Sequence, residues 1–315
     1  MLLAAACEKN ITDSQQDINI SMRASIVNPE TKTLYSDAGD GALSVTWGGE
    51  EKLSVLTVDA SGKVIRNQVL SYSGTSGLKT ITFSGTVSAK ESGQEYLCVY
   101  PALTEIDVPD VGMHKNSIES ISYDGNKLEY DGNYNNTQTA SGNPGQLKDL
   151  DLMIGKPVFV GTDAEVSLAR QIGVLKLVLD INKLPDSNKP LDVTAVMLMN
   201  MERYSFNTTI DINPKTGVCE PDPQQAIIAN ISKTVSVGDQ LIIYYPMAAS
   251  SLKAGDDYGY GIGLIFGNPE DETGYIWLTN KNVTAEVYTG KMTTIKATVP
   301  GTGKWRDIKT GTPVD

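Results

Sequence analysis

Residues 86–102 read TVSAKESGQEYLCVYPA, and residues 234–248 read TVSVGDQLIIYYPMA. Each segment begins with Thr-Val-Ser, passes through a short turn to a glycine, and places Tyr-Pro after six further residues. The two glycines, Gly93 and Gly238, lie 145 residues apart. Because ordinary domains contain about 100–150 residues, this repeat favours two similar domains over a chance match between short strands. In each copy we expect a buried strand that ends at the proline, which has no amide hydrogen to donate.

Apolar residues also recur at every second position elsewhere in the chain. This period of two is found at residues 43–47, 81–83, 206–212 and 293–299 and is typical of half-buried strands. Short turns rich in glycine, aspartate and asparagine separate the strands. The best helical candidate, DLDLMIG at residues 149–155, is short. The pattern therefore predicts an all-β fold made of two tandem β-sandwich domains.

The composition along the chain suggests where these domains begin and end. A polar stretch rich in asparagine, glycine, threonine and serine precedes residue 149, and the apolar strand IGVLKLVLDI follows it. We expect four segments: a signal remnant and tether at 1–17, an N-terminal sandwich at 18–163, a C-terminal sandwich at 164–300, and a tail at 301–315.

The charge and the residue types argue against several classes of function. The 315 residues carry a formal net charge of −12, and the isoelectric point is near 4.6. An acidic chain repels phosphate backbones, so nucleic acid is not an expected partner. The single histidine, His114, rules out a zinc site with several histidines. We find no catalytic constellation, so we expect no enzymatic activity, no metal and no cofactor.

The amino terminus points to attachment at a membrane. Residues 2–6 are apolar and end in small residues directly before Cys7, which resembles the lipobox of bacterial lipoproteins. In such proteins the cysteine is acylated, so Cys7 would hold the chain to the membrane without a transmembrane helix. The alternative is a frayed terminus with an incidental cysteine. Of the other two cysteines, Cys98 lies in an apolar strand and Cys219 in a turn, and neither has metal-site spacing.

Six further segments, taken in order, resemble one family. They are ETKT at 30–33, LSVTWGGEEKLSVL at 43–56, KTITFSGTV at 79–87, Tyr-Pro-Ala at 100–102, LARQIGVLKLVL at 168–179 and GKMTTIKATV at 290–299. Together with the cysteine near the amino terminus, this order resembles the fimbrillin family of Bacteroidota, which comprises type V pilus subunits and related lipoproteins. The resemblance covers roughly residues 20–300.

The family resemblance implies two transthyretin-like β-sandwich domains and a location at the outer membrane, the cell surface or a fimbrium. It also implies assembly with other fimbrial subunits by strand exchange, after a protease removes the first strand behind an arginine. Arg23 is placed for such trimming, although an outward-facing strand residue would look the same. The candidate donor or closing strand runs from Met292 to Val299 and contains Thr293, Ile295 and Ala297. The glycines and prolines of the tail at 301–315 would hinder insertion of a long strand.

Two other interpretations remain open. A monomeric, lectin-like surface protein would share the fold without polymerising, and it would stack a host or bacterial surface sugar on aromatic side chains. Its candidate aromatic residues are Trp277, Trp305, Tyr123, Tyr130 and Tyr134, which are more often core residues. A surface glycoside hydrolase lacks a recognisable pair of carboxylates. The segment YGYGIGLIFG at 258–267 reads as a glycine-lined strand rather than a dinucleotide motif.

Overall fold

The structure is a computed structural model of the chain. It describes residues 17–27, 36–37, 43–44, 46–103, 121–124, 127–132, 136–140, 147, 150–186, 189–200, 205–253, 260–265, 273–278, 284–300, 304–310 and 312–314. No α-helix occurs among these residues, and the fold is all-β as the sequence predicts.

The strands, in chain order, are β1 (Asp17–Val27), β2 (Ser36–Asp37), β3 (Leu43–Ser44), β4 (Glu50–Val58), β5 (Val64–Ser73), β6 (Thr80–Ser88), β7 (Glu95–Tyr100), β8 (Ile121–Asp124), β9 (Lys127–Asp131), β10 (Thr137–Gln138), β11 (Met153–Gly155), β12 (Val158–Val160), β13 (Asp163–Arg170), β14 (Gly173–Ile181), β15 (Leu191–Asn200), β16 (Phe206–Ile212), β17 (Cys219–Gln224), β18 (Ala226–Val235), β19 (Gln240–Met247), β20 (Ser250–Lys253), β21 (Tyr260–Ile265), β22 (Gly274–Leu278), β23 (Thr284–Val287), β24 (Met292–Val299) and β25 (Trp305–Asp307).

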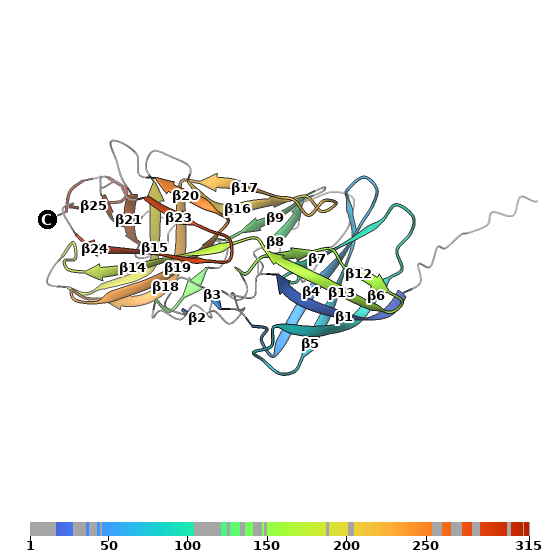
Figure 1. The fold of residues 1–315 in the computed structure, drawn as a ribbon. Coiled ribbons are helices and arrows are strands. Elements are labelled where there is room, and N and C mark those ends of the chain that lie inside the picture. Colours follow the sequence, from blue (N-terminus) through green and yellow to red (C-terminus); the bar gives the residue numbers. More distant parts are fainter. Residues whose placement is uncertain are drawn as a thin grey trace, which may run out of the picture.

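Strands from the first part of the chain form a sheet that closes on itself. Its order is β1-β6-β5-β4-β7-β11-β13, and β13 pairs in turn with β1. The short strand β12 extends β11 along the same edge of β13. We call this body the N-terminal barrel; it lies to the right in Figure 1. The sequence predicted a β-sandwich, whereas this sheet closes into a barrel. Closure removes the two free edges that an open sheet would have.

Alternate side chains of the barrel strands fill its interior. On β7, Tyr96, Cys98 and Tyr100 point inward, while Leu97 and Val99 belong to a separate outer cluster. Because both faces of β7 are buried, its sequence is a continuous apolar run rather than an alternating one. The interior cluster consists of Ile20, Met22, Ala24, Trp47, Leu53, Val55, Leu70, Ile81, Phe83, Val87, Tyr96, Cys98, Tyr100, Met153, Ala164, Val166 and Leu168.

The second body is a sandwich of two sheets, which we call the C-terminal sandwich. One sheet has the order β10-β18-β15-β21-β22-β25, and the other has the order β19-β14-β24. A single apolar cluster is shared between them, with Leu177 and Ile243 contributed by the smaller sheet and Val196 and Leu264 by the larger sheet. This body lies at the opposite end of the molecule from the start of β1 (Figure 1).

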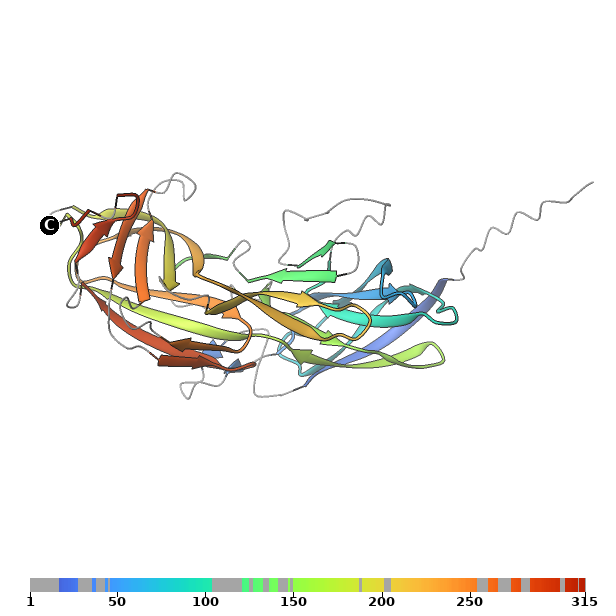
Figure 2. The same cartoon turned by 90° about the horizontal axis from the view of Figure 1, so that it is seen from above.

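A third sheet joins the two bodies. Its order is β17-β16-β9-β8, and its β16–β17 hairpin extends from the sandwich along the barrel (Figure 2). The apolar residues of β16 are all buried, as their period of two predicts. Phe206 packs into the sandwich core, whereas Ile210 and Ile212 pack against Leu97 and Val99 on the outside of the barrel. The hairpin therefore has one end in each body.

The repeated segments adopt similar turns but end differently. Gly93 and Gly238 both have positive φ, at 84° and 94°, which glycine adopts without steric cost. Each turn leads into a buried strand, β7 in the barrel and β19 in the sandwich. The first strand stops at Tyr100, directly before the proline, as expected. The second continues through Pro246 to Met247, so the prediction that proline ends both strands is wrong for the second copy.

Three further expectations can be compared with the fold. Residues 153–155 of the short helical candidate form β11, in agreement with the predicted all-β fold. The expected domain boundary at 163/164 falls at the start of β13, which pairs within the barrel. Residues 137–138, expected in the first domain, form β10 at the edge of the larger sandwich sheet.

The glycine-lined strand, β21, is closely approached by its neighbour β15. A Cβ atom on Gly263 would lie 3.0 Å from the Met197 Cε atom.

Candidate functional site

β1 closes the N-terminal barrel. Residues 17–25 pair antiparallel with β6, and residues 21–27 pair in parallel with β13. Residues 21–25 therefore have backbone partners on both sides. We call the space that β1 fills between β6 and β13 the β1 seat. If the strand were removed, the seat would present two unpaired edges that face each other.

The inward side chains of β1 are part of the barrel core. Ile20 is 4% exposed, and Met22 and Ala24 are fully buried. The Met22 sulfur lies 3.6 Å from the Cys98 sulfur. Burial raises the pKa of the Cys98 thiol far above its ordinary value, so this group stays neutral and acts as a small apolar side chain. Each large apolar side chain buried here stabilises the barrel by about 1.5–3 kcal/mol.

A polar network fixes the beginning of β1. The buried Ser88 hydroxyl donates to the Asp17 carboxylate, with 2.7 Å between the oxygens. The same hydroxyl accepts hydrogen bonds from Arg66 at 2.6 Å and from Gln68 at 3.0 Å. The Gln68 side-chain oxygen accepts a bond from the Ser88 amide at 2.8 Å. Ser88 therefore ties the start of β1 to both β5 and β6.

Arg23, the predicted trimming position, lies on the outer face of β1. Its side chain is 65% exposed, and its guanidinium lies 3.7 Å from the Glu165 carboxylate, which is 73% exposed. Such an exposed pair contributes at most about 1 kcal/mol. The Arg23–Ala24 peptide bond lies where β1 is paired on both sides, and Ala24 is buried. A protease therefore reaches this bond only when β1 leaves its seat or before it has entered the seat.

The strand β24 was predicted either to be donated to another subunit or to close the C-terminal sandwich. It lies at an edge of that sandwich. It pairs in parallel with β14 over eight residues, and no other described strand pairs with it. Its two ends, Met292 and Val299, are buried. Between them, Thr293, Ile295 and Ala297 are half-buried, and Thr294, Lys296 and Thr298 are exposed.

The tail behind β24 is part of the fold. Trp305 is buried at 2% exposure and donates its indole N–H to the Lys183 carbonyl at 3.0 Å. It begins β25, which pairs with β22, and the Val314 amide donates to the Trp305 carbonyl at 3.0 Å. β24 is thus held by its pairing with β14 and by the packed tail that follows it. Releasing it as a donor would also require release of β25.

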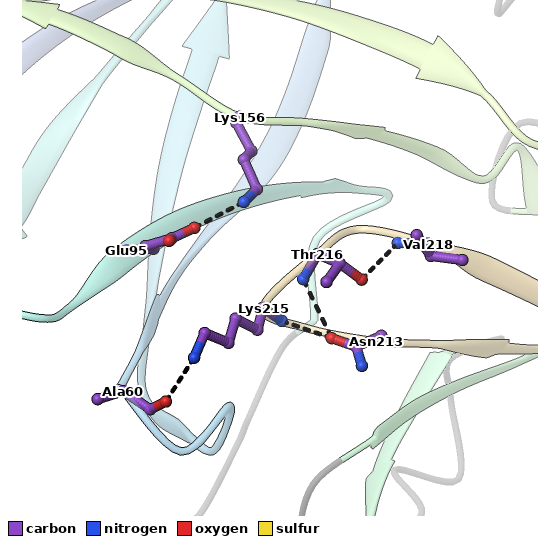
Figure 3. A network of polar contacts seen from close by, with 7 residues as sticks. All are labelled: Ala60, Glu95, Lys156, Asn213, Lys215, Thr216 and Val218. Atoms are coloured by element: carbon purple, nitrogen blue, oxygen red, sulfur yellow. Dashed lines mark hydrogen bonds and ion pairs between the residues drawn. The ribbon is translucent and has the colours of Figure 1, made fainter.

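The turn of the β16–β17 hairpin contacts the barrel (Figure 3). The Lys215 ammonium donates to the Ala60 carbonyl at 2.6 Å. The Asn213 side chain holds the turn by accepting hydrogen bonds from the amides of Lys215 and Thr216, each at 3.0 Å.

An ion pair between Lys156 and Glu95 lies near this turn, with an N–O distance of 2.6 Å (Figure 3). The hydrogen bond and charge of Lys156, with further help from Lys215 and Lys90, lower the pKa of the Glu95 carboxyl.

A buried ion pair marks the junction of the two bodies. Arg170, the last residue of β13, donates two hydrogen bonds to the Asp151 carboxylate. The two side chains are 1% and 0% exposed. The adjacent Gln171 amide donates to the Leu152 carbonyl at 2.9 Å, directly before β14 begins. The sequence offered no signal for this pair, because each residue looks like an ordinary charged residue next to a strand.

The remaining candidate residues are mostly core residues or are not described. Tyr130, Trp277 and Trp305 are buried, so they cannot stack on a sugar. Cys98 and Cys219 are free thiols, and burial raises the pKa of Cys219 to about 11. Cys7, His114 and Tyr134, as well as the side chain of Tyr123, lie outside the described residues.

No group of three or more histidine, cysteine, aspartate or glutamate side chains suited to a metal ion occurs among the described residues. No helix in the described part of the chain has the length and apolar character needed to cross a membrane.

No protein-family model and no curated protein matches the chain. A Bacteroides uniformis protein ascribed a role in cell adhesion is 15% identical, with a TM-score of 0.41 over 94% of this chain and 99% of that chain. A Bacteroides ovatus protein ascribed the same role is 11% identical, with a TM-score of 0.40 over 93% of this chain and 96% of that chain.

A third solved structure is the fimbrial anchor protein Mfa2 from Porphyromonas gingivalis. It is 10% identical, with a TM-score of 0.32 over 84% of this chain and 78% of that chain. The chain is thus similar to cell-adhesion and fimbrial proteins of Bacteroides and Porphyromonas, and because these identities and TM-scores are low, we infer its function from its own residues.

Proposed function

We propose that the chain is a fimbrillin-like lipoprotein of the cell surface and a structural or adhesive component of a fimbrium. In this proposal Cys7 carries the lipid, and the segment up to residue 17 is the tether to the outer membrane. Other fimbrial subunits bind by strand exchange, and the protein has no enzymatic activity.

The position of β1 is the observation that carries this proposal. β1 is a single strand at the start of the fold, yet it closes the barrel through two sets of backbone hydrogen bonds. Removal of residues 17–23 would take Ile20 and Met22 out of the core and leave two apolar pockets. Ala24 to Val27 would remain paired with β13.

A strand from another subunit fits such a seat for physical reasons. Backbone hydrogen bonds to β6 and β13 supply affinity without regard to sequence, while the pockets of Ile20 and Met22 select apolar residues two positions apart. A shift of one residue would turn the apolar side chains toward solvent, so the pockets also set the register.

Treatment with an arginine-specific protease tests the proposal. We expect slow cleavage after Arg23, because the bond is protected while β1 is seated, followed by ladders of oligomers on a denaturing gel. Mass spectrometry of the products identifies the cut. Arg23→Lys is the matched control, because lysine keeps the positive charge near Glu165 but is not cut by this protease. A trimmed chain that remains monomeric at high concentration contradicts assembly by strand exchange.

A further inference from the structure

A pocket at the end of the N-terminal barrel has the features of a ligand site. Its volume is about 590 Å³, within the range of about 300–1,000 Å³ that is usual for sites that bind small molecules. The walls come from the start of β1, the turn between β6 and β7, and the β12–β13 hairpin. The lining residues used below are Lys90, Glu95, Tyr96, Lys156 and Phe159.

Two aromatic rings form one wall of the pocket. The ring centres of Tyr96 and Phe159 are 4.9 Å apart, with the rings tilted by 38°. The Tyr96 hydroxyl donates to the Ser88 carbonyl at 2.5 Å, which fixes its ring. Phe159 is half-buried, whereas its neighbours Val158 and Val160 are 67% and 75% exposed on the other face of β12. The period of two along β12 thus directs Phe159 alone into the pocket.

The rim of the pocket is cationic although the protein is acidic. Lys90 and Lys156 line it, and Lys215 lies close enough to contribute to the lowered pKa of Glu95. The lining thus holds two lysines and one carboxylate, for a net charge of +1 by count. The Lys90 ammonium is exposed and makes no hydrogen bond among the described residues. Lys156 is 47% exposed, and its partner among the described residues is Glu95, so an added anion can approach both lysines.

We propose that this pocket binds a sugar acid, meaning a monosaccharide ring that carries a carboxylate. The apolar face of the ring packs on the half-buried Phe159, whose ring rests against the buried Tyr96, the carboxylate accepts hydrogen bonds from Lys90 and Lys156, and Glu95 accepts hydrogen bonds from ring hydroxyls. This assignment goes beyond the proposed structural role and does not depend on strand exchange.

Two other anionic partners fit the pocket less well. An extended acidic peptide would need a strand edge to pair with, and β12 offers three residues with Pro157 directly before them. An anionic lipid surface is usually bound by clusters of about four to eight basic residues, whereas two lysines line this pocket in a chain of net charge −12.

Ligand-observed NMR and calorimetry with glucuronic acid and N-acetylneuraminic acid test the proposal, with glucose as the uncharged comparison. We expect binding of at least one acid, weakened by added salt, and no comparable binding of glucose. The double variant Lys90→Gln, Lys156→Gln should weaken binding about tenfold or more, because two charge-assisted hydrogen bonds are lost. Phe159→Leu keeps an apolar side chain and should weaken binding by removing the ring.

Lys309→Gln, an exposed lysine in the sandwich turn after β25, is the matched control and should bind as the unaltered chain does. Thermal unfolding of each variant checks that the barrel remains folded, since all altered side chains are exposed or half-buried. The proposal is overturned if neither acid binds at millimolar concentration, if glucose binds equally well, or if the double lysine variant binds unchanged. Binding of an acidic peptide in place of the acids also overturns it.

Discussion

Both bodies pair their first long strand in parallel with their last long strand. In the N-terminal barrel β1 pairs with β13, and in the C-terminal sandwich β14 pairs with β24. The outer sides of the two pairs differ. β1 and β13 also pair with β6, β11 and β12, so the ring closes. In the sandwich β14 also pairs with β19, but β24 has no second strand partner among the described residues.

This difference indicates separate roles for the two bodies. The barrel has no free edge at β1, but its closure depends on a single strand that could be exchanged for another. The sandwich keeps an edge strand whose exposed side chains include Lys296 between two threonines, and a charged side chain on an edge discourages pairing with other chains. In the proposed assembly, the barrel is therefore the candidate acceptor of a foreign strand, and the charge on β24 disfavours pairing at that edge.

Removal of residues up to Arg23 should have the largest effect. The barrel loses seven residues of β1, including Ile20 and Met22, so we expect its stability to fall by an amount on the order of several kcal/mol while the sandwich is less affected. Tryptophan fluorescence during urea unfolding can follow both bodies, because Trp47 lies in the barrel core and Trp277 and Trp305 lie in the sandwich core. An unchanged single transition would contradict the role of β1.

The junction between the bodies should be the next most sensitive position. Arg170→Ala leaves the Asp151 carboxylate buried without its partner, and we expect a loss of about 3–5 kcal/mol. The double variant Arg170→Met, Asp151→Leu removes both charges and should recover much of that loss. Chemical denaturation followed by circular dichroism measures both. If Arg170→Ala costs less than about 1 kcal/mol, the pair does not hold the junction.

Matched substitutions in β1 and β24 measure how firmly each strand is held. Met22→Ala creates a cavity in a fully buried site and should cost about 2–5 kcal/mol. Ile295→Ala, at a half-buried position of β24, should cost less. Because Met22→Ala loosens β1, it should also speed cleavage after Arg23 by the arginine-specific protease, as followed by mass spectrometry. Equal costs at the two positions would mean that β1 is held no more firmly than the edge strand.

Lys296→Val should have the smallest effect on stability, within about 0.5 kcal/mol. Without the charge, however, the edge of β24 becomes open to pairing, so we expect dimers by sedimentation velocity. Lys309→Val, at an exposed turn, is the control and should remain monomeric. A monomeric Lys296→Val variant would show that another feature protects this edge.

The sequence predicted several of the strands but not their partners. The period of two identified the buried residues of β16 at 206–212, and the repeat located the turns at Gly93 and Gly238. Closure of the barrel was not predicted, because apolar alternation along β1 is the same whether a strand has one neighbour or two. β25 was missed because the few residues around Trp305 show no periodicity.

Parts of the candidate site were hidden for the same reason. The sequence predicted Arg23 as the position of trimming. Its backbone pairing on both sides, which protects the following peptide bond, depends on strands that are distant in the sequence. Asp151 and Arg170 are joined only in the folded chain. The pocket beside Phe159 combines residues from three separate strands and turns, none of which forms a motif.

Residue-by-residue hydrogen exchange in the untrimmed protein, measured by NMR, distinguishes pairing on both sides of β1 from pairing on one side of β24. Because residues 21–25 of β1 are paired on both sides, we expect slow exchange at every amide of that run. Because β24 is paired on one side, we expect slow and fast amides to alternate along it. Fast exchange at alternate residues of β1, or uniform protection along β24, would contradict the account.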